Sequence, residues 1–305
     1  MIVLPRYHWL RLLFVWHGSV LPRVMSRLWL VFGLSVVAGL IHHWWISHHA
    51  QSTLNISIFT LLGVSLAIFL GFRNSASYDR FWEARKLWGR LYIVSRSLTG
   101  KVSAALGKTD DAIQFLETMC ALNYVLKGQL RNDDVSQHLL RLLNDEQRAE
   151  LETSRHRMAR LLLWLHQSNQ QWLQQQRISD TQWLAINQNL DELSEAIGGC
   201  ERISTTPIPF TYRVLLNRTV TIYCLLLPLA LVNSIGWLTP FIAVFVAYTY
   251  LALDCLGDEL EEPFGKEGND LPLSVLCYNI EANVRDMLQQ PITISPPPKQ
   301  GIYQF

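Results

Sequence analysis

Two long stretches of the chain contain no charged residue. The 45 residues 28–72 hold no Lys, Arg, Asp or Glu, and neither do the 35 residues 219–253. One bilayer crossing takes about 20 predominantly apolar residues, so each stretch is long enough for two crossings. Short polar or helix-breaking patches, at 47–55 and 232–236, divide the stretches near their middles. The pattern predicts an all-α membrane protein with four transmembrane helices in two hairpins.

The breaks and the flanking charges divide the chain into eight expected segments. They are an interfacial N-terminal helix at 1–23, a first span at 24–46, a second span at 56–79 that continues into the cytoplasm, a cytoplasmic helical region at 80–213, a third span at 214–235, a fourth at 237–256, a cytoplasmic helical segment at 257–290 and an extended or disordered tail at 291–305. A soluble helical core fits poorly, because such cores rarely exceed about 10–14 apolar residues per helix.

Positive charges flank the spans on one side only. Arg23 and Arg27 lie near the start of the first span, Arg73 and Arg80 follow the apolar part of the second, and the turns within the two hairpins hold no Lys or Arg. The positive-inside rule therefore places both termini and the region 80–213 in the cytoplasm.

The cytoplasmic region is expected to consist of helices. They are Asp110–Arg131, a long polar helix at Asp145–Gln176, and Ser179–Ile197. Ser179 followed by Gln182 has the pattern of a capping box, and Gly198-Gly199 is expected to stop the third helix. No alternation typical of strands is present.

Overall charge and cysteine usage argue against nucleic-acid binding and against disulfide bonds. A net charge of +1 gives no reason to expect nucleic acid as a partner. The five cysteines are isolated and lie in the predicted cytoplasm or membrane, where thiols normally stay reduced, so we expect no disulfide framework. We expect no cofactor.

The membrane segments lack the groups that most membrane functions use. Coupled transporters place titratable side chains in mid-membrane, and we expect none there. The sequence contains no H-E-x-x-H, G-x-S-x-G, Walker A or dinucleotide-binding motif. We therefore expect that the protein is not an enzyme. A passive pore or a non-conducting scaffold remains. Four helices of this kind are too few to enclose a water path, so a pore would require several subunits.

One apolar stripe on the second span is a candidate pore lining. Val64, Ile68 and Phe72 recur every four residues on one helix face. Such a stripe can form a hydrophobic neck that gates by dewetting, although most apolar stripes are ordinary packing surfaces.

Four motifs in the chain resemble those of the bestrophin family, in particular its bacterial branch. They are the run 69–85 (FLGFRNSASYDRFWEAR), residues 16–19 (WHGS), residues 198–210 (GGCERISTTPIPF) and residues 262–265 (EPFG). The resemblance covers nearly the whole chain in the right order. It implies a homopentameric ion channel with one axial pore, located in the bacterial inner membrane, whose partners are its own copies, membrane lipid and small monovalent ions.

The resemblance also implies particular residues. The neck corresponds to Val64, Ile68 and Phe72, and a second, cytoplasmic aperture to Thr181. Bestrophins usually are apolar at that aperture, so Thr181 departs from the pattern. Chloride and other anions are suggested as the permeant ions. A cation-selective channel of the same architecture and a non-conducting scaffold remain as alternatives, because an uncharged neck does not fix the sign of the ion.

Two weaker site hypotheses concern metals. Eukaryotic bestrophins bind Ca²⁺ after the Pro-Phe-Gly motif, where this chain offers only Glu267, Asn269 and Asp270 beside a lysine. A solvated helix end is the expected role of the preceding acidic residues 258–262. Four histidines at the outer end of the first span could bind Zn²⁺ or protons, or could be solvated within an aromatic interfacial belt. They are His42, His43, His48 and His49.

Overall fold

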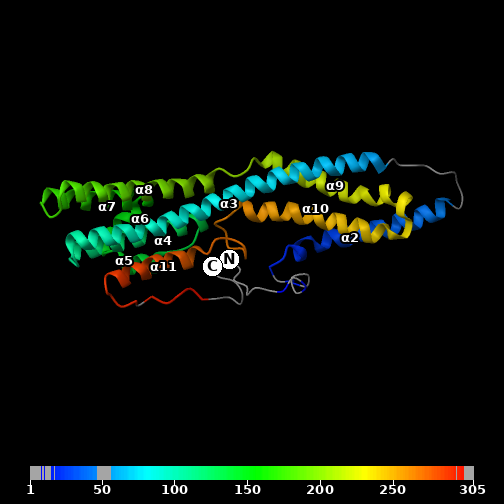
Figure 1. Ribbon diagram of the computed structural model, residues 1–305. Helices are drawn as coiled ribbons and strands as arrows, with labels where there is room; N and C mark the ends of the chain where they lie inside the picture. The colour runs from blue at the N-terminus through cyan, green and yellow to red at the C-terminus, as the bar shows by residue number, and fades with distance from the viewer. Residues whose placement is uncertain are drawn as a thin grey trace. The chain divides into compact units, whose positions relative to one another are not determined.

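The computed structural model describes residues 8, 10, 15–16, 18–46, 56–292 and 294–298, and every regular element there is a helix (Figure 1). The elements are α2 (Leu21–Ile46), α3 (Ile56–Leu106), α4 (Asp110–Arg131), α5 (Ser136–Leu142), α6 (Asp145–Thr153), α7 (Arg157–Gln174), α8 (Asp180–Thr205), α9 (Phe210–Ile235), the 3₁₀ helix η1 (Gly236–Leu238), α10 (Thr239–Glu261) and α11 (Leu273–Met287). The expected all-helical class is confirmed.

Three apolar segments are long enough to cross a membrane. They are Leu21–Trp44, Ser57–Leu106 and Phe210–Glu261. The third contains α9 and α10, which are separated by η1, where Gly236 adopts a positive φ of 54°. Glycine tolerates this conformation without steric cost, which explains why the helix breaks here. The expected interfacial helix at 1–23 lies mostly outside the described residues, and its last three residues belong to α2.

Residues 4–81 and 207–262 form one compact unit. Its core combines α2, the first half of α3, α9 and α10, and contains Val24, Leu28, Val31, Leu66, Leu70, Leu216, Val220, Cys224, Leu227, Ala243, Ala247 and Leu251. The small side chains of Ala243 and Ala247 are fully buried in α10. Small residues let helix backbones approach closely, which is a common basis of helix association in membranes.

The second unit is formed by residues 82–206 together with the described residues from 263 onward. Here the second half of α3 contributes Trp88, Leu91 and Leu98, which are at most 1% exposed. The rings of Phe115 in α4 and Trp172 in α7 lie 5.1 Å apart. Helix α4 has the predicted bounds, because its first turn carries two aspartates and its apolar face is continuous.

The expected long helix at Asp145–Gln176 is wrong. The chain forms α6 and α7 there, with an extended residue, Ser154, directly after α6. Asn144 and Gln147 build a capping box at the start of α6. The capping box sets the start of α6. The break between α6 and α7 lets Leu151 of α6 and Leu161 of α7 both lie buried, so packing overrides the helical periodicity that suggested a continuous helix.

The stop expected at Gly198-Gly199 is also wrong, since α8 continues to Thr205. The predicted capping box of Ser179 and Gln182 is present. A Cβ atom at Gly199 would lie 2.7 Å from the Leu87 side chain, whereas one at Gly198 would meet nothing within 4 Å. Gly199 therefore serves the close packing of α3 against α8 and does not end the helix.

A buried carboxylate joins three helices of the second unit. Glu281 of α11 is 1% exposed and accepts hydrogen bonds from Tyr124 at 2.9 Å, from Arg141 Nη2 at 3.0 Å and from Arg285 Nε at 2.9 Å. Burial by itself raises the pKa of Glu281, but the hydrogen bonds from the two arginines outweigh burial and hold the pKa below its ordinary value.

The two glycines of α8 make a matched test of packing. We expect Gly198→Ala to raise the free energy of unfolding by up to about 1 kcal/mol, because alanine is the better helix former and the site is open. Gly199→Ala should gain less or lose stability, because Leu87 must move. Thermal unfolding of both variants measures the difference in stability. A Gly199→Ala variant at least as stable as Gly198→Ala would contradict the packing role of Gly199.

Glu281 predicts a pH dependence of stability. Because its pKa is lower in the folded chain, its contribution is complete above about pH 5 and is lost as the pH falls through the folded pKa. At neutral pH, Glu281→Gln should lower the free energy of unfolding by about 3 kcal/mol, since two arginines lose their charged partner. The difference from the wild type should shrink below about pH 4.

Unfolding curves at neutral and acid pH measure this effect of Glu281→Gln. Glu152→Gln, at an exposed position of α6, is the control and should change neither curve. If Glu281→Gln lowered the free energy of unfolding by the same amount in acid as at neutral pH, Glu281 would not be ionised in the folded protein at neutral pH.

Candidate functional site

The predicted neck residues lie exposed on one face of α3. Val64, Ile68 and Phe72 are 55%, 52% and 66% exposed in the single chain. The face of α3 that is buried in the first unit carries Leu66 and Leu70, at 3% and 0%. At about 100° per residue these two sets project to opposite sides of the helix. An apolar stripe that the chain itself leaves uncovered requires another apolar surface, or a dewetted space, to face it.

A buried arginine follows the stripe directly. The Arg73 side chain is 0% exposed, and its Nη1 lies 2.6 Å from Asp254 Oδ1 of α10. Its Nη2 pairs with Asp258 and lies 3.7 Å from Glu261 Oε2. A buried guanidinium is tolerated only when carboxylates neutralise it, so this arrangement fixes α3 to α10 at the end of the stripe.

Neighbouring groups complete the arrangement around Arg73. Asn217 of α9 donates to Asp254 Oδ2 at 3.0 Å, and Arg80 Nε donates to the Glu261 carbonyl at 2.7 Å. A Cβ atom at Gly257 would lie 2.7 Å from Asn74 Oδ1 and 3.4 Å from Arg73 Nε. Gly257 therefore gives α3 room to approach α10 at this point.

Sequence reasoning missed this cluster, and it corrects one expectation. Asp254 falls within the expected fourth span, and a charge inside an apolar helix signals a buried partner. The solvated role expected for residues 258–262 is wrong in part. Glu261 is 3% exposed, and the Glu259 side chain is 7% exposed and pairs with Arg23 at 3.1 Å. The arginines of α2 and α3 draw these carboxylates inward, whereas Glu262 is exposed.

Thr181 lies in the first turn of α8 and is exposed. Its Oγ1 is 2.9 Å from the hydroxyl of Ser179, the residue that caps the helix. The N–H groups of a first helical turn and the positive end of the helix dipole favour anions, while the exposed Asp180 beside Thr181 opposes them.

For the weak calcium candidates Glu267, Asn269 and Asp270, the structure shows a contact between the first and the last. Asp270 is buried, and its Oδ2 accepts from the backbone N–H of Glu267 at 2.6 Å. Burial raises the pKa of Asp270 above its ordinary value in spite of this hydrogen bond. Lys266 pairs with Asp133 at 2.5 Å. Within the described residues, no three His, Cys, Asp or Glu side chains are placed to hold a metal.

The candidate histidine site is only partly described. His48 and His49 lie outside the described residues. His42 and His43 are adjacent in α2, and the His43 ring lies 6.2 Å from the ring of Trp237. The aromatic contact agrees with the interfacial alternative, in which histidines stand within an aromatic belt.

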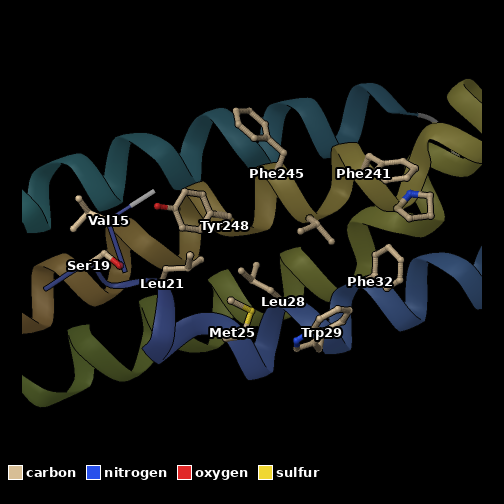
Figure 2. A pocket seen from close by; sticks show the side chains of 12 residues that line it. Val15, Ser19, Leu21, Met25, Leu28, Trp29, Phe32, Phe241, Phe245 and Tyr248 are labelled. Carbon is tan, nitrogen blue, oxygen red and sulfur yellow. The ribbon is translucent and has the colours of Figure 1, made fainter. Parts of the chain in front are cut away.

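An apolar cavity of about 780 Å³ lies between α2 and α10 (Figure 2). Trp29 and Phe32 of α2 and Phe241, Phe245 and Tyr248 of α10 are among its lining residues. Among the described residues that line it, the polar side-chain groups are the hydroxyls of Ser19 and Tyr248 and the indole N–H of Trp29, and none of these residues carries a carboxylate, imidazole, amine or thiol.

Comparison with known proteins adds sequence and structural relatives. A family described as "Bacterial/Fungal Bestrophin protein" matches residues 1–286. Proteins named voltage-dependent anion channel-forming protein are 43% identical over 296 residues in Ralstonia nicotianae and 42% identical over 291 residues in Escherichia coli. These matches cover 95% of each chain in the first case and 94% of each in the second.

Solved structures agree with the sequence relatives. The crystal structure of a bacterial bestrophin homolog from Klebsiella pneumoniae matches with a TM-score of 0.83 at 41% identity, covering 88% of this chain and 99% of that one. Both the family match and these identities extend over nearly the full length, as the four sequence motifs indicated. The chain therefore belongs to the bacterial and fungal bestrophin family.

Proposed function

We propose that this chain assembles into a homopentameric channel that conducts small monovalent anions such as chloride. The observation that carries the proposal is the uncovered stripe of Val64, Ile68 and Phe72, in a helix whose opposite face is buried. Five copies of this stripe around an axis form an apolar neck. Such a neck passes ions without coordinating them and closes by losing its water.

The membrane topology follows from the same segments. Helices α2, the first half of α3, α9 and α10 provide four crossings, and the two connecting turns face outward because they lack Lys and Arg. Both termini and the second unit then lie in the cytoplasm of a bacterial cell, below the inner membrane. The remaining exposed apolar surface contacts lipid and neighbouring subunits.

Anion selectivity rests on the relatives and on local chemistry. The relatives from Ralstonia nicotianae and Escherichia coli carry the name of anion channel-forming proteins. Thr181 stands at the positive end of α8, where hydroxyl and backbone N–H groups can donate to an anion. A ring of five Thr181 side chains would form a wet cytoplasmic aperture.

Flux measurements on the purified protein test this proposal. In liposomes, a chloride gradient should drive tracer flux, a sodium gradient should drive far less, and native mass spectrometry should give a pentamer. Sodium flux exceeding chloride flux would assign the channel to cations. A pentamer without flux would support a scaffold, and a clean monomer or dimer would refute the pore.

The neck residues predict the effect of widening the pore. Replacing Val64, Ile68 and Phe72 together by alanine lowers the cost of hydrating the apolar segment, so current should rise severalfold or gating should be lost. The matched control replaces three exposed apolar residues of α3 outside the stripe, namely Ile58, Leu62 and Phe69, by alanine. Equal effects of both triple variants, measured as single-channel current, would place the neck elsewhere.

Thr181 predicts a change in selectivity. Thr181→Glu adds five negative charges near the axis and should shift the reversal potential toward cations, because low-dielectric walls focus their field. Thr181→Ile should lower the unitary conductance, because an apolar ring dewets more readily. Thr153→Glu, at the exposed end of α6, is the control. If both Thr181 variants kept the reversal potential and the conductance of the wild type, Thr181 would not line the aperture.

A further inference from the structure

A polar cavity in the second unit has no role in the proposed ion path. It measures about 610 Å³ and lies between α4, α7 and α8. Arg155, His156 and Arg157, at the beginning of α7, line one side, and Gln129 and Glu201 are among its other lining residues. Its volume falls in the range of about 300–1,000 Å³ that is usual for small-molecule sites.

The charges that line this cavity are unevenly satisfied. Glu201 accepts a hydrogen bond from Gln129 at 2.9 Å, and Asp133 pairs with Lys266 at 2.5 Å. Within the described part of the chain, Arg155 and Arg157 make no ion pair and no side-chain hydrogen bond. Asp133 is thus neutralised by Lys266, whereas the only partner of the Glu201 carboxylate among the described residues is the neutral amide of Gln129. The two exposed guanidinium groups outnumber this one carboxylate, which leaves the cavity with positive charge to offer a ligand.

The local helix adds to this preference. Helix α7 begins at Arg157, its N-cap residue His156 makes no capping hydrogen bond, and its first turn has no acidic residue. The positive end of a helix dipole repels cations, so without a ligand the arginines at the start of α7 are in an unfavourable electrostatic environment. An anion in the cavity would relieve the repulsion and accept from the N–H groups of the first turn.

We propose that this cavity binds a small soluble molecule through a phosphate group held by Arg155 and Arg157. A phosphate presents several acceptor oxygens in different directions, which suits two guanidinium groups and a helix N-terminus better than a planar carboxylate does. Val125, Met158, Leu162 and Ile197 supply apolar surface for the organic part of the ligand. Gly198 leaves open space there, since a Cβ atom would meet nothing within 4 Å.

Binding of inorganic phosphate to the detergent-purified full-length assembly tests the proposal. Titration calorimetry at constant chloride concentration should show saturable binding, with acetate binding at least about tenfold more weakly. Arg155→Gln with Arg157→Gln should weaken phosphate binding by about 100-fold, because two charge-assisted contacts are lost. Gly198→Leu, which keeps both arginines and fills the cavity, should weaken binding of a phosphate ester such as glycerol phosphate by at least about tenfold.

The control is Arg160→Gln, on the same helix, because Arg160 is paired with Glu150 at 3.0 Å and does not line the cavity. This variant should bind phosphate as the wild type does. No saturable binding in the wild type, equal loss in Arg160→Gln, or unchanged binding in the double arginine variant would overturn the proposal. Binding of short-chain phosphatidic acid without binding of free phosphate would overturn the proposal that the ligand is a soluble molecule. None of these readouts depends on ion flux.

Discussion

The buried guanidinium of Arg73 is the constraint on which the membrane unit depends. It ends the apolar stripe of α3 and must be neutralised inside the protein, because an isolated buried charge is far too costly to maintain. Asp254 and Glu261 of α10 supply that neutralisation, and Gly257 allows the close approach. The register of α3 against α10 is thereby fixed. The direction in which the opposite face of α3 projects follows from this register.

That opposite face remains without a partner in the single chain. Its apolar side chains are more than half exposed, whereas the stripe through Leu66 and Leu70 is fully packed. A helix that is apolar on both sides but covered on one needs lipid, another copy or a dewetted lumen for the rest. The proposed pentamer assigns the neck stripe to the lumen, and membership of the bestrophin family agrees with a membrane channel.

The second unit also has a buried charged group, the carboxylate of Glu281 among α4, α5 and α11. Glu281 holds two arginines and a tyrosine together, and Gly199 lets α3 and α8 pack closely. The same unit leaves two arginines unpaired at the start of α7. Both arginines are exposed to solvent, and their guanidinium groups remain available to an anion in the cavity that they line.

The sequence by itself determined the all-helical class, the apolar segments, the family, α4 and the capped start of α8, because length, periodicity and capping are local properties. Its spacing of four residues also indicated the apolar stripe of Val64, Ile68 and Phe72, which the family resemblance assigns to a pore neck. Only the tertiary structure decided that Gly198-Gly199 continues a helix, that Asp145–Gln176 is divided, and that Asp254 and Glu261 enclose Arg73. These outcomes depend on side chains more than 100 residues apart or on packing between helices, and a local pattern contains neither.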